Sequence, residues 1–397
     1  MLFSAIEQAP ADPILGLTDA FKADARSNKI NLGVGIYKNE AGQTPVLDSV
    51  KKAEALLLET QTSKSYLGIE GVAEYSALVQ DLLFGESSDI RQSNRLFTAQ
   101  APGGTGSLRV AAEFLVNVAN VSTIWVSNPT WANHNAIFTA AGLTVKSYRY
   151  YDKQNHGLDF DGMLADLSQV EANDVVLVHG CCHNPTGIDL NLEQWQQLAN
   201  LCKQQQAMPL FDFAYQGFAN GVEEDAAGLR LVASIVPELM VANSFSKNFG
   251  LYNERIGGIT LLSESTDSGQ RAFSQVKKTI RAIYSNPPAH GALIVATILA
   301  NPELKQLWIE EVKQMRERIH KMRTLFVSKL ADAGITQDFS FIERQNGMFS
   351  FSGLSVEQVD RLKQEFGIYI VGSGRISVAG MTRSNMDDLV AGIKAVL

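Results

Sequence analysis

The stretch Leu239-Met-Val-Ala-Asn-Ser-Phe-Ser-Lys-Asn-Phe-Gly250 joins an apolar, strand-like run to a lysine, Lys247. Asp212 lies 35 positions earlier, at the end of a similar apolar run. A lysine beyond the carboxyl end of a buried strand can lose part of its hydration, and its pKa then falls, as a Schiff-base lysine requires. An acid beyond a neighbouring strand can keep a pyridinium nitrogen protonated. The pair therefore makes pyridoxal phosphate chemistry our first hypothesis.

The composition is that of an ordinary globular protein. With 397 residues, of which 45% are hydrophobic, the chain is long enough for one large core or two unequal ones. A net charge of -8 without a Lys/Arg cluster argues against a nucleic-acid surface. No apolar segment approaches 18 residues, and the N-terminus lacks the pattern of a secretion signal. We therefore expect a cytoplasmic protein that contacts no membrane.

The three cysteines, Cys181, Cys182 and Cys202, suit neither a disulfide framework nor a metal site, because two of them are adjacent. Adjacent residues in an extended segment point in opposite directions, which also separates Cys181, Cys182 and His183 as ligands. The sequence therefore predicts buried free thiols and no metal.

Apolar runs bounded by turn residues alternate with helical patterns through the middle of the chain, which predicts an α/β domain with a mainly parallel sheet. An amphipathic stretch from Asn191 to Gln206 is one such helix. In sheets of this kind, ligands gather beyond the carboxyl ends of the strands. The strand-like runs are Ser122 to Val126, Leu143 to Ser147, Asp174 to His179, Met208 to Phe213, Leu239 to Ala242 and Gly257 to Leu262.

A long charged helix is predicted from Asn301-Pro302 to about Ala333-Gly334, opened by the proline and closed near the glycine. At about 30 residues it spans roughly 45 Å, enough to bridge two domains. Beyond it, short strand-like runs alternate with a helix from Ser355 to Phe366 and indicate a second, smaller α/β unit.

Two segments at strand ends carry further candidate chemistry. Ala101-Pro-Gly-Gly-Thr-Gly-Ser107 precedes a helical run, so its backbone N–H groups can cradle a phosphate, although a plain strand-to-helix turn would look the same. It matches neither a Walker loop nor a dinucleotide fingerprint. In His179-Gly-Cys-Cys-His-Asn-Pro-Thr-Gly187, Asn184 can donate to a phenolate oxygen of a ring cofactor, the alternative being an Asn-Pro turn.

Together these segments resemble the class I aminotransferases of fold type I. The motifs stand in that family's order: Asn184-Pro-Thr-Gly187, Asp212-Phe-Ala-Tyr215, Ser244-Phe-Ser-Lys247 and Arg255-Ile-Gly-Gly258. Four more resemble its aspartate and aromatic amino acid branch: Tyr66-Leu-Gly-Ile-Glu-Gly71, Ser127-Asn-Pro-Thr-Trp131, Arg281-Ala-Ile-Tyr-Ser-Asn-Pro-Pro288 and Gly374-Arg-Ile-Ser-Val-Ala-Gly-Met381. The resemblance covers essentially the whole chain.

The resemblance implies a fold and an assembly. A large cofactor-binding domain, residues 46–312, would hold a mainly parallel seven-stranded sheet flanked by helices. A smaller α/β domain would combine residues 13–45 with 313–397, and residues 1–12 would form an N-terminal arm. The family is homodimeric with shared active sites, and its peptide bonds before Pro129 and Pro185 are cis.

The resemblance also implies a role for each site residue. Lys247 would anchor pyridoxal 5'-phosphate covalently and shuttle protons, Asp212 would bind the pyridine nitrogen, and Asn184 and Tyr215 would bind the phenolic oxygen. The implied catalytic residues are Lys247, Asp212 and Tyr215. The implied cofactor-binding residues are Gly104, Thr105, Trp131, His134, Asn184, Asp212, Tyr215, Ser244, Ser246, Lys247 and Arg255, with Tyr66 reaching in from the partner subunit.

The implied reaction moves the amino group of aspartate, and of aromatic amino acids, to 2-oxoglutarate by a ping-pong mechanism. Arg375 would clamp the substrate α-carboxylate and Arg281, from the partner subunit, a distal carboxylate. Gly35, Tyr66, Trp131 and Asn184 complete the implied substrate contacts. Polar residues at Lys38, Thr44, Thr105 and Asn286 resemble the aspartate type, while Ser65 departs from the asparagine usual there. An enzyme that prefers aromatic substrates is the alternative.

Three rival interpretations are weaker. Ser244-Phe-Ser-Lys247 also matches the Ser-x-x-Lys of penicillin-recognising hydrolases, but their Ser-Asp-Asn and Lys-Thr-Gly motifs are absent from the chain. A protein that only senses an amino acid would not need the whole cofactor set. Another fold type I reaction, such as decarboxylation or β-elimination, fits less well, because two arginines would neutralise both carboxylates of a dicarboxylic substrate.

Overall fold

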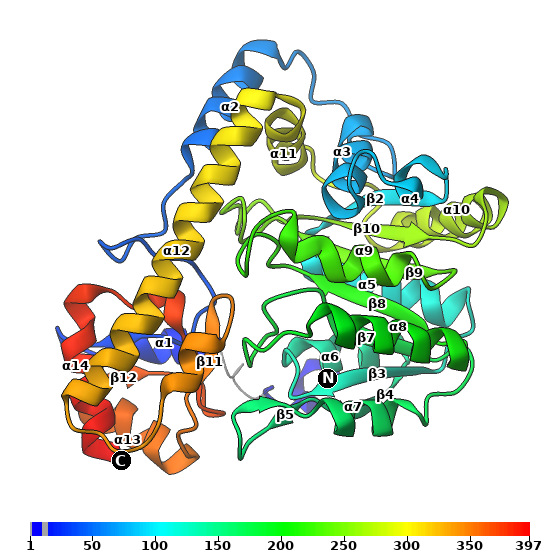
Figure 1. Cartoon of the computed structure of the whole chain (residues 1–397). Helices are drawn as coiled ribbons and strands as arrows, with labels where there is room; N and C mark the ends of the chain where they lie inside the picture. The colour runs from blue at the N-terminus through cyan, green and yellow to red at the C-terminus, as the bar shows by residue number, and fades with distance from the viewer. Residues whose placement is uncertain (1, 10–14) are drawn as a thin grey trace. The chain divides into compact units, whose positions relative to one another are not determined.

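The computed structural model of the chain describes residues 2–9 and 15–397. These residues separate into two compact units (Figure 1), the larger made of residues 45–318 and 345–347. The smaller comprises the described residues up to Thr44, together with residues 319–344 and 348–397. The domain boundaries at 46 and 312 stay a prediction. Of the expected N-terminal arm, residues 1 and 10–12 lie outside the described residues.

A seven-stranded sheet forms the centre of the larger unit, in the order β2-β10-β9-β8-β7-β3-β4. Strand β10 is antiparallel to both its neighbours, and the other neighbouring strands run parallel. The expected α/β fold with a mainly parallel sheet is thus confirmed. The strands are β2 (Leu96–Pro102), β3 (Thr123–Asn128), β4 (Thr144–Arg149), β7 (Val175–His179), β8 (Met208–Phe213), β9 (Leu239–Ser244) and β10 (Ile256–Leu262).

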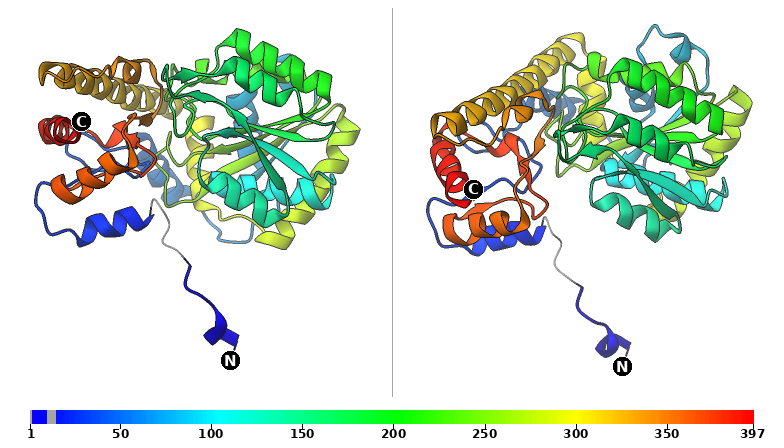
Figure 2. Two further views of the ribbon diagram at one scale, coloured as in Figure 1. Left: turned by 90° about the horizontal axis from the view of Figure 1, so that it is seen from below. Right: turned by 60° about the horizontal axis from the view of Figure 1, so that its bottom comes forward.

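Helices cover both faces of this sheet (Figure 2). The helices of the larger unit, besides the start of the long helix α12 (Pro302–Asp332), are α2 (Asp48–Thr60), α3 (Ala73–Phe84), α4 (Asp89–Gln92), α5 (Gly103–Asn117), α6 (Asn133–Ala141), α7 (Phe160–Leu167), α8 (Leu192–Gln205), η2 (Glu224–Ala226), α9 (Ala227–Ala233), α10 (Thr266–Ile283) and α11 (His290–Ala300). A short hairpin, β5 (Tyr151–Asp152) with β6 (Gly157–Leu158), follows β4.

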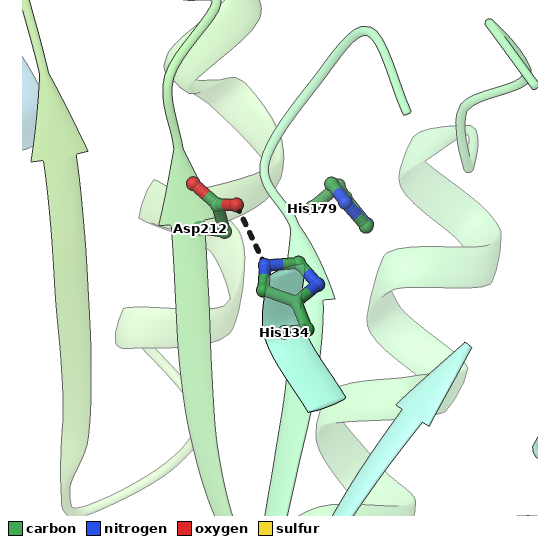
Figure 3. Close-up of side chains that lie close together, drawn as sticks. All are labelled: His134, His179 and Asp212. Carbon is green, nitrogen blue, oxygen red and sulfur yellow. Dashed lines mark hydrogen bonds and ion pairs between the residues drawn. The ribbon is translucent and has the colours of Figure 1, made fainter. Parts of the chain in front are cut away.

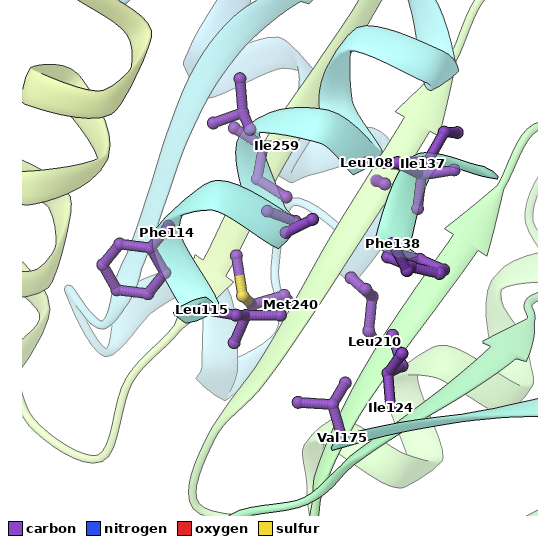
Figure 4. Packing of buried hydrophobic residues seen from close by; sticks show 14 of the residues in the cluster. Leu108, Phe114, Leu115, Ile124, Ile137, Phe138, Val175, Leu210, Met240 and Ile259 are labelled. Atoms are coloured by element: carbon purple, nitrogen blue, oxygen red, sulfur yellow. The ribbon is translucent and has the colours of Figure 1, made fainter. Parts of the chain in front are cut away.

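Alternate residues of each strand face opposite helix layers, because successive side chains in a strand point to opposite sides. On one side, Leu210 and Met240 belong to a buried cluster with residues of α5, α6 and α10, such as Leu115 (Figure 4). On the other side, the ring of Phe211 stacks on Trp195 of α8, with centroids 5.4 Å apart. Burial on both faces explains why the strands are almost continuously apolar.

Helix α12 (Pro302–Asp332) is the long helix that the sequence predicts. The side chain of Asn301 accepts hydrogen bonds from the backbone N–H groups of Glu303 and Leu304, at 3.0 and 3.1 Å. Gly334 follows the helix with φ +75°, a conformation that favours glycine after a helix end. The first part of α12 belongs to the larger unit and the part from Ile319 onward to the smaller one.

The smaller unit contains two strand pairs and their helices. Strand β1 (Ile30–Asn31) pairs parallel with β12 (Ile368–Tyr369), and β11 (Phe349–Phe351) pairs antiparallel with β13 (Arg375–Ser377). Its helices, besides the end of α12, are η1 (Leu2–Ala5), α1 (Leu15–Ala23), η3 (Ser340–Arg344), α13 (Val356–Phe366), η4 (Val378–Gly380) and α14 (Arg383–Val396).

Two backbone features bear on earlier expectations. The peptide bonds Asn128-Pro129 and Asn184-Pro185 are both cis, as the resemblance implied. Among residues 2–9 and 15–397, no helix combines the length and apolar composition that a bilayer span needs.

Candidate functional site

The carboxyl ends of four parallel strands bring the candidate residues of the larger unit to one edge of the sheet. Asp212 lies near the end of β8, opposite His179 of β7 and Ala242 of β9 in the strand register. The loop after β7 carries Asn184, and the segment after β9 carries Lys247. The structure therefore brings these residues to the same edge of the sheet.

Asp212 is paired with His134, one of the cofactor-binding residues that the resemblance implies. His134 Nε2 lies 2.9 Å from Asp212 Oδ2 (Figure 3). His134 Nδ1 lies 2.8 Å from Thr130 Oγ1. His134 is completely buried and Asp212 is 8% exposed. Burial by itself would raise the pKa of Asp212, but the hydrogen bond with His134 and the nearby cations hold the pKa below its usual range. Asp212 is thus an ionised carboxylate that is largely shielded from solvent.

A second histidine, His179, lies beside this pair and was not among the predicted site residues. Its ring centroid is 5.3 Å from that of His134, and neither ring nitrogen has a hydrogen-bond partner among the described residues. Burial, and to a smaller extent the nearby His134, lower the pKa of His179 to about 3. His179 is therefore neutral near Asp212, although its sequence signal was only its position at the strand end.

Lys247 lies near the aromatic ring of Tyr215, with Nζ 5.2 Å from the ring centroid. Its ammonium is close enough to Asp212 to lower the pKa of that carboxyl. Tyr215 and Asn184 are both buried. Trp131 makes an edge contact with His134 at 5.2 Å between ring centroids. The structure thus groups Lys247, Asp212, Tyr215, His134 and Trp131 around the ends of β8 and β9.

An anion cradle lies at the start of α5. The helix begins at Gly103, whose φ of +75° favours glycine, and a Cβ there would lie 2.5 Å from Arg255 Nη2. Arg255 Nη1 donates to Ser246 Oγ at 3.4 Å, and Ser244 Oγ donates to the same oxygen at 3.2 Å. A helix N-terminus, a guanidinium and hydroxyl groups are together suited to a phosphate.

Gly104 and Thr105 belong to the same cradle. Both lie in the first turn of α5, whose backbone N–H groups have no partner inside the helix. A Cβ on Gly104 would lie 3.3 Å from the Cβ of Ser244, so the turn packs closely on the segment after β9. The predicted phosphate-binding residues Gly104, Thr105, Ser244, Ser246 and Arg255 therefore gather at one place.

In the smaller unit, Arg375 is a buried arginine with a fixed side chain. Its Nη2 donates to the carbonyl oxygen of Gly33 at 2.6 Å, and its guanidinium lies 4.2 Å from the ring centroid of Phe349. A Cβ on Gly35 would lie 2.5 Å from Phe349 Cζ, so glycine is needed for this packing. Gly35 and Arg375 thus share Phe349 as a neighbour.

Two predicted substrate residues, Tyr66 and Arg281, lie at the surface. Tyr66 is 93% exposed and Arg281 is exposed at the end of α10, where its guanidinium bonds to Ser285 Oγ. Within one chain, these residues are not buried as Asp212 and His134 are.

The expectation that Cys181 and Cys182 lie in an extended segment and point in opposite directions is wrong. Cys182 has φ +52°, so the segment is not extended there, and ligand atoms of Cys181, Cys182 and Asp225 lie within 4.8 Å of one another. The oxygens of Asp225 accept hydrogen bonds from the backbone N–H groups of four residues, namely Gly217, Ala219, Asn220 and Gly221. Those bonds occupy the lone pairs that a metal would use.

Comparison with known proteins agrees with this geometry. The family Aminotransferase class I and II matches residues 27–393. The chain is 59% identical over 396 residues to aspartate aminotransferase of Escherichia coli (strain K12), with 100% of both chains covered. It is 45% identical to the aromatic-amino-acid aminotransferase of Pseudomonas aeruginosa, covering 99% of this chain and 98% of that one.

A solved structure of the same type is also similar. The aromatic-amino-acid aminotransferase of Burkholderia pseudomallei, covalently bound to pyridoxal phosphate, superimposes with a TM-score of 0.97 at 49% identity, and 100% of each chain is covered. The fold and the strand-end site define the chain as a transaminase. It belongs to the class I and II aminotransferases, as its motifs predicted.

Proposed function

We propose that the protein transfers the amino group of aspartate, and more slowly of aromatic amino acids, to 2-oxoglutarate, with pyridoxal 5'-phosphate as cofactor and as a cytoplasmic homodimer. One observation carries this proposal. The ionised Asp212 is held by the buried His134 at a strand end that also presents Lys247, beside an anion cradle. A ring nitrogen, an aldehyde carbon and a phosphate each find a partner in that arrangement.

The residues present fit this cofactor. Gly104, Thr105, Ser244, Ser246 and Arg255 would hold the phosphate, and Trp131 would stack on the ring, whose nitrogen would bond to Asp212. When bound, pyridoxal phosphate supplies an electron-withdrawing ring that takes up the electrons released at the substrate Cα. Because Asp212 is ionised and dry, it stabilises a protonated ring nitrogen, which strengthens that withdrawal.

The remaining steps belong to the side chains of the protein. Lys247 would hold the cofactor covalently, and its amine, once released, would move the proton that leaves the substrate Cα. Asn184 and Tyr215, both buried, would donate to the phenolic oxygen and favour its anion. Arg375 and Arg281 would bind the two carboxylates of a dicarboxylic substrate. Because both carboxylates would be neutralised, loss of carbon dioxide is disfavoured and amino transfer is favoured.

Alanine at Gly103 should weaken cofactor binding. The left-handed backbone costs a residue with a Cβ roughly 1–2 kcal/mol, and the new Cβ would push on Arg255, 2.5 Å away. We therefore expect Gly103→Ala to raise the dissociation constant for pyridoxal phosphate about tenfold or more. Titration of cofactor-free protein, followed by absorbance, measures this constant.

Gly142→Ala is the matched control for backbone strain. Gly142 also has a positive φ, +101° after helix α6, but the nearest atom to its Cβ would be Val116 Cγ1 at 3.8 Å. This variant should lose stability yet bind the cofactor as the unaltered protein does. An equal loss of cofactor affinity in both variants would contradict the cradle.

The proposed substrate order is tested by steady-state kcat/KM for aspartate, tyrosine and phenylalanine with 2-oxoglutarate. Differences between pockets are worth about 1–3 kcal/mol, so we expect aspartate to lead by roughly 10- to 200-fold with aromatic turnover still measurable. The similarity to the Burkholderia aromatic-amino-acid enzyme supports a second candidate, an aromatic-preferring transaminase. A higher kcat/KM for tyrosine or phenylalanine than for aspartate would establish that candidate instead.

Arg281→Ala should act on dicarboxylic substrates alone. Removal of a charged partner from a substrate carboxylate costs about 2–5 kcal/mol in an enclosed site, so kcat/KM for aspartate should fall roughly 30-fold or more. Phenylalanine carries no distal carboxylate and should lose little. Parallel assays with aspartate and phenylalanine measure the difference, and an equal loss for both would exclude the distal-carboxylate role.

A mixing experiment tests whether Arg281 serves the partner's site. Its exposure, together with the 93% exposure of Tyr66, supports a contribution to a second subunit. Chains carrying Lys247→Ala and chains carrying Arg281→Ala are unfolded together and refolded. In a symmetric dimer, half of the products are hybrids with one intact site of two, so activity should return to about a quarter of the unaltered value. If mixing restores no activity, Arg281 serves the site of its own chain.

A further inference from the structure

Asp189 closes the loop that carries Asn184. Its Oδ1 accepts the backbone N–H of His183 and its Oδ2 that of Cys182, both at 2.9 Å. These two residues directly precede Asn184. The Asp189 carboxylate therefore fixes the backbone from which the Asn184 side chain projects.

The same loop has a backbone that needs external support. Cys182 adopts φ +52°, which is uncommon for a residue with a side chain and persists only where the surroundings enforce it. The His183 ring is fixed separately, with Nε2 2.9 Å from Ser127 Oγ and its plane stacked 4.0 Å from the Tyr150 ring centroid. Asp189 supplies the acceptors for the N–H groups on either side of the Cys182 Cα.

A third donor ties another segment to this carboxylate. Asn346 Nδ2 donates to Asp189 Oδ2 at 3.2 Å, and the Asn346 backbone N–H donates to the Gly187 carbonyl at 2.6 Å. At Gly347, φ is +76° and a Cβ would lie 2.4 Å from Cys182 Cβ, so only glycine permits this packing. The segment 345–347 is thus fastened at both ends of the Asn184 loop.

This segment has an unusual place in the chain. Residues 345–347 belong to the larger unit, whereas the residues on both sides, in η3 and from Met348 onward, belong to the smaller one. Gln345, at its start, is buried. The hydrogen bonds of Asn346 with Asp189 and Gly187 hold this three-residue segment against the larger unit.

We propose that Asp189 is a positioning residue that sets the Asn184 carboxamide against the phenolic oxygen of the cofactor and fastens residues 345–347 to the same loop. The inference rests on the proposed function for the role of Asn184, but the anchoring itself does not need a cofactor. Asparagine at 189 would turn an amide N–H₂ toward donors that now meet a carboxylate, so the loop would shift.

The first test uses cofactor-free protein. In Asp189→Asn, amide hydrogen exchange at Cys182 and His183, and across residues 345–348, should accelerate about tenfold or more, because local opening is easier once the acceptors are lost. Asn346→Ala removes only the third donor, so exchange should accelerate at 345–348 with a smaller change at Cys182 and His183. Unchanged exchange in Asp189→Asn would overturn the anchoring role, whether or not the protein is a transaminase.

The second test uses cofactor-loaded protein and a spectroscopic reading. Weaker donation from Asn184 to the phenolic oxygen disfavours its anion, so the covalently bound cofactor should hold its proton to higher pH. In Asp189→Asn, the midpoint of the visible absorbance change against pH should rise by about half a unit or more, a threefold change in proton affinity. An unchanged midpoint, with accelerated exchange, would leave Asp189 as a loop anchor that does not position Asn184 and would refute the proposal.

Asp174→Asn is the matched control. Asp174 is also a buried carboxylate, accepting from Trp125 Nε1 at 2.8 Å and from the Glu171 N–H at 3.3 Å, but it precedes β7 at the opposite strand end. This variant should be less stable while the absorbance midpoint stays in place. An equal shift in both variants would show a general loss of stability and overturn the proposal. If Asp189→Asn does not fold, Asp189→Glu, which keeps the charge but displaces the carboxylate, decides by the same two readings.

Discussion

Lys247→Ala is expected to lower transamination by at least about 10⁴-fold, the contribution of a positioned general acid/base, with a further loss because no covalent link can form. Lys247 lies near Tyr215, and its ammonium is close enough to Asp212 to lower the pKa of that carboxyl. Single-turnover mixing of aspartate with cofactor-loaded protein, followed by absorbance, measures the amino transfer directly.

The variant should keep its affinity for the cofactor phosphate, because the cradle at Gly104, Ser246 and Arg255 is unchanged. Borohydride should attach the cofactor irreversibly to the unaltered protein and not to Lys247→Ala, as mass spectrometry of the peptides would show. Lys203→Ala, an exposed lysine of α8, is the control and should behave like the unaltered chain. Retention of more than a small fraction of the amino-transfer rate in Lys247→Ala would refute both roles of this lysine.

Much of the larger unit could be predicted because its strands are buried on both faces and read as apolar runs. Strand β2 was absent from the runs that we recognised, although the resemblance supplied seven strands. Its interior carries Thr98 and Gln100, which are buried but bonded, Thr98 Oγ1 to Thr260 Oγ1 at 2.9 Å and Gln100 Nε2 to the Pro288 carbonyl at 2.6 Å. Polar side chains satisfied by distant partners interrupt the pattern that reveals a strand.

The candidate site divides in the same way. Asp212, Asn184 and Lys247 could be placed together because each follows an apolar run, and parallel strands end at one edge. The partners of Asp212 required the resemblance for His134 and the structure for His179. Asp189 had no signal at all, since its role depends on a left-handed Cys182 and on Asn346, 157 positions away. Contacts made by irregular backbone leave no periodic trace in a sequence.

Arg375→Ala should lower kcat/KM for aspartate and phenylalanine alike, by about 10²- to 10³-fold, because every amino acid carries the α-carboxylate that this arginine would clamp. The side chain is suited to that task since it is buried, and the bond to the Gly33 carbonyl and the Phe349 ring already fix its direction. A preset guanidinium loses little freedom when a carboxylate binds in its fork. Steady-state assays with both substrates measure the effect.

Two further variants serve as controls for Arg375→Ala. Arg375→Lys keeps the charge but loses the planar fork, so it should recover only part of the loss. Arg361→Ala removes an exposed arginine of α13 that pairs with Glu365 and should leave kcat/KM unchanged. Arg281→Ala should lower kcat/KM for aspartate and leave that for phenylalanine nearly unchanged. The roles of the two arginines are therefore distinguished by comparing the loss for aspartate with the loss for phenylalanine in each variant. A variant at Arg375 that lost aspartate but kept phenylalanine would reverse the two assignments, since the α-carboxylate is the one group that both substrates share.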